Sequence, residues 1–382
     1  MKKKLNLLLF IAFWVPVTVF SQDRQQPTDS TTTKEIKYPV FKVKGLFQSR
    51  YIVGLHDKVD VNGMHHETDK YTNNTFDVKR VRFSTAVAIS EWAEVNVLLN
   101  LADFKSDPKN KVLENAYIQY KITEDFAVIL GQFRPSFGLE NTFPVDIVKS
   151  MDFSNQYYEF GSNGWESFQI GAGIIGTTHI STLPVKYALT VFNGNGRNQN
   201  NDKDNGKQFA GRTVITLSKK NQFNLGLNGG YGKVFDEPVY AAGIDISGLF
   251  NLGRKFSLEF QAEAKQGTNH YRYFLIPVAD RTVELKDYQV RGWYALPNLK
   301  YNVGKPRFNS IEISCRYEEL DLNFKRDSNI RRTVLPMVGF EFLKNYNSRL
   351  QLGFQMDFYE KEISNTTTYN NKLFIMQIQS RF

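Results

Sequence analysis

Residues 255–265, KFSLEFQAEAK, decide the fold class because their apolar and polar side chains alternate with a period of two. One face holds Phe256, Leu258, Phe260, Ala262 and Ala264, and the other holds Ser257, Glu259, Gln261, Glu263 and Lys265. A helix would need a period near 3.6, whereas successive side chains of a β-strand point to opposite faces of a sheet. The segment is therefore predicted to be a strand with one apolar and one charged face.

The same alternation recurs along the chain from about Phe41 to Phe382. It is clear in residues 310–318 and 349–359, whereas residues 126–134 and 168–176 are apolar on both faces. About sixteen strands are predicted, at 41–54, 76–90, 93–103, 113–122, 126–134, 167–176, 184–193, 208–217, 222–233, 238–250, 255–265, 287–299, 309–320, 331–342, 348–359 and 372–382.

Short and long connections alternate between these segments, which is typical of an outer-membrane β-barrel with short periplasmic turns and longer outer loops. Residues 234–237 are the exception, because an outer loop is expected there and the link is short. An even strand number returns both ends of the barrel to the periplasm. The fold class predicted is all-β, a transmembrane antiparallel β-barrel of about sixteen strands.

Composition agrees with a barrel and disfavours the other all-β classes. Mean hydropathy is −0.40, yet 14% of the residues are aromatic, and no apolar run of spanning length follows the first twenty residues. A propeller would show repeats of about forty residues, and none is found. A soluble sandwich would need a fully apolar inner face, and the long polar links argue against it.

The N-terminal residues indicate export. Lys2, Lys3 and Lys4 precede an apolar stretch, Leu5 to Phe20, and cleavage is expected after Ser21. An uncleaved anchor is the alternative, although the stretch is short for a spanning helix. We therefore expect a signal peptide at 1–21, a disordered periplasmic lead-in at 22–40 and the barrel at 41–382, in the outer membrane of a Gram-negative bacterium.

The last segment carries a further sign of a barrel. Phe374, Met376, Ile378 and Phe382 lie on one face, with Gln377, Gln379 and Arg381 on the other. A terminal aromatic residue on an amphipathic final strand is the signal that barrel assembly machinery reads. Phe382 is therefore interpreted as the assembly signal, with that machinery and outer-membrane lipid as partners.

Charge and site motifs point away from other functions. The formal net charge is +9, and loss of the three leader lysines lowers it to +6, a mild excess that suits an anion-favouring channel. No basic cluster suggests nucleic acid, and the single Cys315 excludes an internal disulfide. Metal sites at His65-His66 or at Asp202–Gly206 are not favoured, so no metal, cofactor, catalytic residue or enzyme activity is expected.

Several stretches resemble the phosphate-selective porin O and P family. The most distinctive is Gly131 to Glu140, GQFRPSFGLE, which is similar to the family's glycine–glutamine–aromatic–basic segment ending in Pro-x-Phe-Gly. Others resemble it in order along the chain, namely 76–83 (FDVKRVRF), 113–120 (LENAYIQY), 191–194 (VFNG), 209–212 (FAGR), 292–294 (GWY) and 316–318 (RYE). The resemblance implies a sixteen-stranded, usually trimeric, anion-passing pore with arginines along it and lysines at its constriction.

Strand faces predict which basic residues line the lumen. Val81 and Phe83 should face lipid, which turns Arg80 and Arg82 inward, and a charge facing lipid at the midplane would cost roughly 2–4 kcal/mol. The same argument turns Lys42, Lys44 and Arg50 of strand 41–54 inward. It also turns Arg212 inward, because the nearby Ile215 should face lipid. The expected solute path is Lys42, Lys44, Arg50, Arg80, Arg82, Arg134 and Arg212.

Acidic residues on later strands oppose a purely basic pore. Glu94, Glu259, Glu263, Glu312 and Glu318 should also face inward, so one side of the lumen is expected to be basic and the other acidic. Such a transverse field would orient polar or zwitterionic solutes. The loop 136–166 is the candidate constriction, because it is long and its aromatic residues, Phe153, Tyr157, Tyr158, Phe160 and Trp165, could anchor it inside the lumen.

The leading hypothesis is therefore passive transport of small hydrophilic solutes, preferably anions such as phosphate, through a barrel that can form a homotrimer. The alternative is a non-conducting barrel with a structural or adhesive role in an envelope complex.

Overall fold

The computed structural model describes residues 37–68, 70–105, 112–199, 202 and 204–382. Residues 38–382 form one compact unit. The expected signal peptide and most of the expected lead-in lie outside the described residues. None of the described helices is long and apolar enough to cross a membrane.

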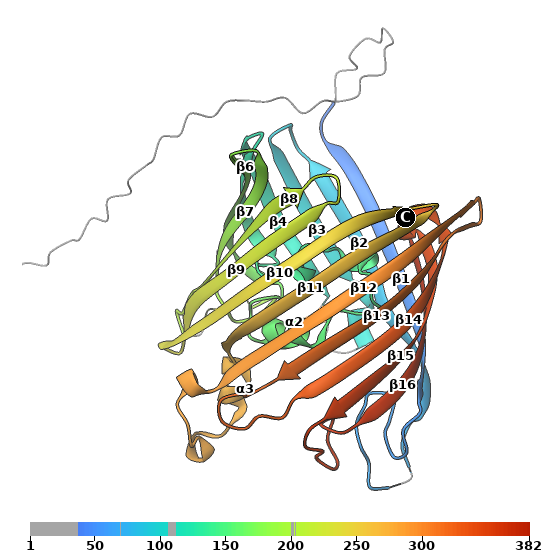
Figure 1. The fold of residues 1–382 in the computed structure, drawn as a ribbon. Helices are drawn as coiled ribbons and strands as arrows, with labels where there is room; N and C mark the ends of the chain where they lie inside the picture. Colours follow the sequence, from blue (N-terminus) through green and yellow to red (C-terminus); the bar gives the residue numbers. More distant parts are fainter. Residues whose placement is uncertain (1–36, 69, 106–111, 200–201, 203) are drawn as a thin grey trace, which may run out of the picture. The chain divides into compact units, whose positions relative to one another are not determined.

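Sixteen antiparallel strands close into a barrel in which each strand pairs with its sequence neighbours (Figure 1). The strands are β1 Val40–Gly54, β2 Asn74–Ala88, β3 Ala93–Asn100, β4 Leu113–Thr123, β5 Phe126–Phe133, β6 Gln169–Ile180, β7 Leu183–Phe192, β8 Gln208–Ser218, β9 Phe223–Val234, β10 Glu237–Gly253, β11 Phe256–Thr268, β12 Gln289–Lys305, β13 Phe308–Asp321, β14 Arg331–Leu343, β15 Ser348–Tyr359 and β16 Asn371–Arg381. The predicted fold class and strand number are confirmed.

The barrel closes where β1 pairs with β16. Phe382 continues this seam, since its carbonyl accepts from the Gly45 N–H at 3.0 Å and its N–H donates back at 3.2 Å. A Cβ at residue 45 would overlap the Phe382 ring, so the glycine leaves room for the aromatic side chain. The terminal aromatic residue therefore packs over the first strand.

Side chains alternate between the two faces as predicted. The outer face exposes large apolar residues such as Phe41, Phe83 and Ile313, at 64%, 43% and 61% of their surface. The inner face holds polar residues, and Gln48, Gln379 and Glu318 are almost completely buried there. An outer apolar face and a polar interior are what a barrel in a bilayer requires.

Predicted and observed strand ends differ most in β12 and β6, and by three residues in β3, β10 and β11; β6 runs to Ile180, four residues beyond its predicted end. A short 3-10 helix, Leu101–Lys105, follows β3 where a continued strand was expected. β12 runs to Lys305, beyond the predicted end at Leu299, because Tyr301 still pairs with Phe256 on one side and Ile311 on the other.

The short link between β9 and β10 is also confirmed. Phe235 and Asp236 form it, and both have positive φ, 49° and 66°. Positive φ at both central residues is the conformation of a type I′ hairpin turn, whose twist matches that of the flanking strands. An outer connection can therefore be as tight as a periplasmic one.

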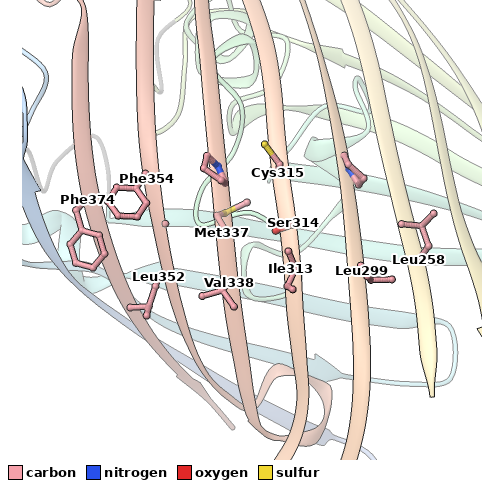
Figure 2. Close-up of a pocket in the computed structure, with 13 residues that line it drawn as sticks. Leu258, Leu299, Ile313, Ser314, Cys315, Met337, Val338, Leu352, Phe354 and Phe374 are labelled. Atoms are coloured by element: carbon pink, nitrogen blue, oxygen red, sulfur yellow. The ribbon is translucent and has the colours of Figure 1, made fainter. Parts of the chain in front are cut away.

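Two prolines make a shallow groove on the lipid-facing side of β11–β16. Pairing of β12 with β13 skips Leu296 and Pro297, and pairing of β14 with β15 skips Leu335 and Pro336, because proline has no N–H to donate. The groove, of about 610 Å³, is lined mainly by apolar side chains, including those of Pro297 and Pro336. Cys315 lies among the lining residues (Figure 2). Cys315 thus acts as a small apolar residue of the outer face, as predicted.

Candidate pore constriction

The long connection between β5 and β6, residues 134–168, folds into the barrel. It contains two 3-10 turns, η2 Glu140–Thr142 and η3 Val145–Ile147, and the helix α2 Asn155–Ser162, which lies inside the ring of strands (Figure 1). The Asn155 N–H donates to Glu318 of β13 at 2.7 Å, and Arg349 of β15 donates to a loop carbonyl at 2.9 Å. We call residues 134–168 the constriction loop.

Aromatic side chains hold this loop in place, as the sequence predicted. Phe137, Phe160 and Trp165 are fully buried and pack with apolar residues of β7, β8, β10, β12 and β13. Phe153 and Tyr157 stack at 4.1 Å in a second cluster with Leu46, Val145 and Val148. Tyr158 differs from the expectation, because 45% of its surface is exposed.

Two glycines let the chain turn inward at the end of β5. Gly131 has a φ of +130°, and a Cβ there would overlap the carbonyl oxygen of Ala116. Gly138 has a φ of +79°, and a Cβ there would overlap the Glu166 carboxylate. Both conformations are rare for residues with a side chain. The Gly131–Glu140 motif therefore encodes the entry of the constriction loop into the lumen.

The buried carboxyl of Glu140 lies at the start of helix α2. Ser154 caps α2 by accepting from the Tyr157 N–H, and the Ser154 N–H donates to Glu140 at 3.0 Å. Burial raises the pKa of Glu140 to about 7, against the attraction of Arg316 and Lys265. The carboxyl of Glu140 therefore titrates near neutral pH.

Asp152, at the tip of the loop, is shared by three cations of β1 and β2. Arg80 lies 2.8 Å from its carboxylate, Lys79 2.9 Å and Arg50 3.3 Å. Burial alone would raise the pKa of Asp152, but Lys79, Arg80 and Arg50 outweigh it and hold the pKa well below its usual value. Asp152 is thus an anion throughout the physiological range, and its three partners leave an excess of positive charge.

A second basic group, Arg82, Arg134 and Arg197, lies beside the first, and two of its members contact the ring of Phe168. Arg82 pairs with Glu114 at 2.8 Å, and Arg197 of the β7–β8 loop pairs with Asp103 at 3.3 Å. The Arg134 guanidinium lies 4.8 Å from the Phe168 ring centre, within the range of a cation–π contact. Among the described residues Arg134 forms no ion pair, and its Nε has no hydrogen-bond partner.

The remaining predicted path residues lie apart from these two groups. Arg212 is buried in a two-pronged ion pair with Asp245, at 2.5 and 2.9 Å, and also donates to Asn228. Lys42 and Lys44 face the lumen near the short-turn end and are exposed. The structure therefore brings together Arg50, Arg80, Arg82 and Arg134 but not Lys42, Lys44 or Arg212.

The predicted acidic side of the lumen is present, and most of its glutamates form ion pairs. Four of its glutamates contact a cation, since Glu259 lies 2.7 Å from Lys149, Glu263 3.2 Å from Lys265, Glu312 3.5 Å from Lys300 and Glu318 3.0 Å from Arg316. Lys265 also contacts Glu166 and Lys300 also contacts Glu341, so acids outnumber cations in this group. The local excess of positive charge lies elsewhere, where the constriction loop meets β1 and β2.

Two lumen cations were not predicted, and for a third the partner was not predicted. Lys79 would face lipid by simple alternation, but a bulge opposite Gln48 and Ser49 allows it to reach Asp152. Arg197 comes from an outer loop, and Lys265 was predicted to face inward without a partner. Lys265 lies 2.6 Å from Glu166 in a fully buried pair that fixes the end of the loop. The period-two pattern of the sequence predicts the face on which a side chain lies, but it does not predict ion pairs such as these.

An open cavity of about 660 Å³ remains between the start of the constriction loop and strands β4–β10. Leu139 and Phe143 of the loop line one side, and Lys121, Lys186 and Thr177 line the barrel side. The barrel side also includes Glu124 and Asp125, so the lining of the cavity carries charges of both signs.

The family assignment follows from a sequence model. The model of the family described as phosphate-selective porin O and P matches residues 53–268, which is more than half of the chain. The chain belongs to the phosphate-selective porin O and P family. The match includes β2, the constriction loop and Arg212. No curated protein shows significant sequence similarity to the chain.

Solved structures share the fold of this porin. The in-vitro-folded OmpT of Vibrio cholerae, in its trimer form, has a TM-score of 0.54 at 11% identity and covers 91% of this chain and 100% of its own. The anion-selective porin of Comamonas acidovorans has a TM-score of 0.55 at 7% identity, covering 90% and 100%. OprB of Pseudomonas putida at high pH has a TM-score of 0.56 at 12% identity, covering 90% and 94%.

The family and the fold agree on the class of protein. Both support an outer-membrane porin, a channel rather than an enzyme. At identities this low the structures establish the fold alone, so the solute must be argued from the constriction of this chain.

Proposed function

We propose that this porin passes small hydrophilic solutes by passive diffusion and favours anions such as phosphate. The observation that carries the proposal is the excess of positive charge where the constriction loop meets β1–β5. Six cations gather there around three acids, with Arg50, Lys79, Arg80, Arg82, Arg134 and Arg197 facing Asp103, Glu114 and Asp152. A constriction of one sign raises the local concentration of counter-ions and lowers the barrier for their passage.

Arg134 is the cation best placed to meet a solute. Its guanidinium rests on the aromatic rings of Phe153 and Phe168, at 5.5 and 4.8 Å, and among the described residues no acid satisfies it. An unpaired guanidinium presents a rigid fork of N–H donors that matches the oxygens of a phosphate or carboxylate. The other cations of the constriction form ion pairs with acids, so they act on a passing solute mainly through the electrostatic field.

Planar-bilayer recording tests the proposal directly. The reversal potential in a salt gradient should be anion-selective, and joint neutralisation of Arg80, Arg82 and Arg134 to glutamine should move it toward zero. Cation-selective reversal in the wild type would refute anion preference, and unchanged selectivity in the triple variant would remove these residues from the path. Replacement of chloride by phosphate should give a saturating current if phosphate binds in the constriction.

A non-conducting structural barrel is the second candidate, and the packing of the loop favours it. Phe137, Phe160 and Trp165 are fully buried, and ion pairs such as Lys265 with Glu166 hold the loop across the lumen. A folded barrel that shows no conductance in the same recordings would establish this alternative and refute the porin function.

Export, assembly and oligomeric state complete the proposal. We propose that residues 1–21 direct export, that Phe382 is read by barrel assembly machinery, and that the porin forms a homotrimer in the outer membrane. Support comes from the packing of Phe382 against Gly45 and from the trimer form of the OmpT structure. Native mass spectrometry of the purified barrel would give its oligomeric state.

A further inference from the structure

Four consecutive short turns carry a band of positive charge around one end of the barrel. They join β8–β9, β10–β11, β12–β13 and β14–β15, and they lie at the end that holds the C-terminus (Figure 1). Their residues include no Asp or Glu. We call the seven basic residues the basic rim, which consists of Lys219, Lys220, Arg254, Lys255, Lys305, Arg307 and Lys344.

All seven side chains of the basic rim are exposed. Among the residues that the structure describes, none of them forms an ion pair. Some lysines of the outer loops are paired within the chain, since Lys286 lies 2.6 Å from Glu284 and Lys361 lies 3.0 Å from Asp327. A concentrated positive band without internal partners suits an anion from outside the chain.

The depth of the basic rim points to the lipid headgroups. Apolar side chains of the outer face end directly beside it, with Leu217, Leu252, Phe256 and Leu343 between 40% and 58% exposed. Lys305 follows Tyr301 and Val303 at two-residue spacing on the lipid-facing side of β12. Long basic side chains at the edge of an apolar belt extend to the level of the headgroups.

Two other turns at this end are acidic. The β2–β3 turn contains Glu91, and the β4–β5 turn contains Glu124 and Asp125, without a Lys or Arg in either turn. Because strands β8–β15 are neighbours in the barrel, the basic rim is continuous along one side of this end. Among the turns at this end, Lys and Arg therefore occur only on the side formed by β8–β15.

We propose that the basic rim binds the phosphate groups of anionic phospholipids in the leaflet at the short-turn end. The inference requires only that the barrel spans a membrane and is independent of conduction through the lumen. A basic cluster beside an anionic membrane surface gains about 1 kcal/mol for each Lys or Arg, which corresponds to about fivefold in affinity. Several such side chains acting on one side would retain a shell of anionic lipid.

Native mass spectrometry of the detergent-solubilised barrel tests this with phosphatidylglycerol and phosphatidylcholine of identical acyl chains. The test variant replaces Lys219, Lys220, Lys305 and Arg307 with glutamine. The control variant replaces four exposed lysines of the outer loops with glutamine, namely Lys70, Lys286, Lys325 and Lys361. Gel mobility of unheated samples confirms that each barrel is folded, and a variant with Lys219→Arg and Lys220→Arg should bind like the wild type.

The wild type should prefer phosphatidylglycerol by about fivefold or more, the test variant should lose that preference, and the control should keep it. Excess inorganic phosphate should not displace the lipid. Equal binding of the two lipids by the wild type, or an equal loss in the control variant, would overturn the proposal. Retained lipid preference in the test variant together with lost co-sedimentation on peptidoglycan would assign the basic rim to that polymer instead.

Discussion

The guanidinium of Arg80 in β2 donates to the carboxylate of Asp152 at 2.8 Å, although 72 positions separate the two residues in the chain. Arg50 and Lys79 share the same carboxylate, so the first two strands hold the tip of the constriction loop. One acid therefore sets both the position of the loop and the net charge beside it. Substitutions can separate these two roles.

Asp152→Asn should increase anion selectivity and loosen the loop. The change removes the one negative charge shared by three cations, so the local excess of positive charge grows. Loss of charge-assisted hydrogen bonds should cost about 1.5–3 kcal/mol of loop anchoring. Reversal potentials measure the first effect and hydrogen exchange of residues 139–165 the second. A shift toward cation selectivity would contradict the prediction.

Arg134→Gln and Arg212→Gln should have opposite profiles. Arg134 has no ion pair among the described residues, so its loss should reduce anion selectivity at little cost in stability. Loss of Arg212 leaves Asp245 buried without its partner and should cost about 3–5 kcal/mol, with little change in selectivity. Urea unfolding in detergent and bilayer recordings of both variants check this. Equal selectivity shifts would show that Arg212 also lies in the path.

The constriction loop should be held less firmly at pH 8 than at pH 6. Burial raises the pKa of Glu140 to about 7, above its ordinary value, so the folded state favours the protonated carboxyl. The resulting stabilisation is complete below the ordinary pKa and is lost as pH rises through about 7, a difference on the order of 1–3 kcal/mol.

Hydrogen exchange of residues 139–165, corrected for its intrinsic pH dependence, measures this change. Glu140→Gln should remove the pH dependence, whereas Glu284→Gln, at an exposed outer position, should retain it. Equal protection of the wild-type loop at the two pH values would refute the assignment of Glu140.

Gly131→Ala should destabilise the barrel by about 1–3 kcal/mol, because an alanine there adopts an unfavourable φ and meets the Ala116 carbonyl. Gly229→Ala is the matched control, since nothing lies within 4 Å of a Cβ at that glycine and its φ is ordinary. Refolding yield in detergent and unfolding midpoints report the difference. Similar losses of stability in both variants would mean that the effect of Gly131→Ala comes from strand propensity and not from the close approach of the Ala116 carbonyl.

The strands were predictable because lipid outside and polar groups inside impose a period of two on every one of them. Residues 255–265 show it directly, and the inward direction of Arg80, Arg82 and Arg212 follows from the same rule. The type I′ turn at Phe235 and Asp236 was predictable in length but not in conformation, since neither residue is the glycine or asparagine that usually marks it.

The partners of the inward residues were not predictable. The two-residue period predicts that Arg212 and Arg80 face the lumen. Only the structure of the closed barrel shows that Arg212 pairs with Asp245 and that Arg80 pairs with Asp152. Lys79 was missed because a bulge changes the direction of a side chain without altering the pattern of residue types. The ion pairs of Lys265 with Glu166 and of Lys149 with Glu259 depend in the same way on neighbours across strands and loops.

The contacts of the constriction loop also imply an order of events during assembly. The loop follows β5 in the chain, yet it is held by hydrogen bonds with Glu318 of β13, Arg349 of β15 and Gln379 of β16. The Gln379 side chain donates to the Asp146 carbonyl at 2.9 Å. These hydrogen-bonding partners are not in place until the last strands have joined the sheet. A partly built barrel therefore lacks these contacts, and the constriction loop can reach its final position only after the sheet has closed.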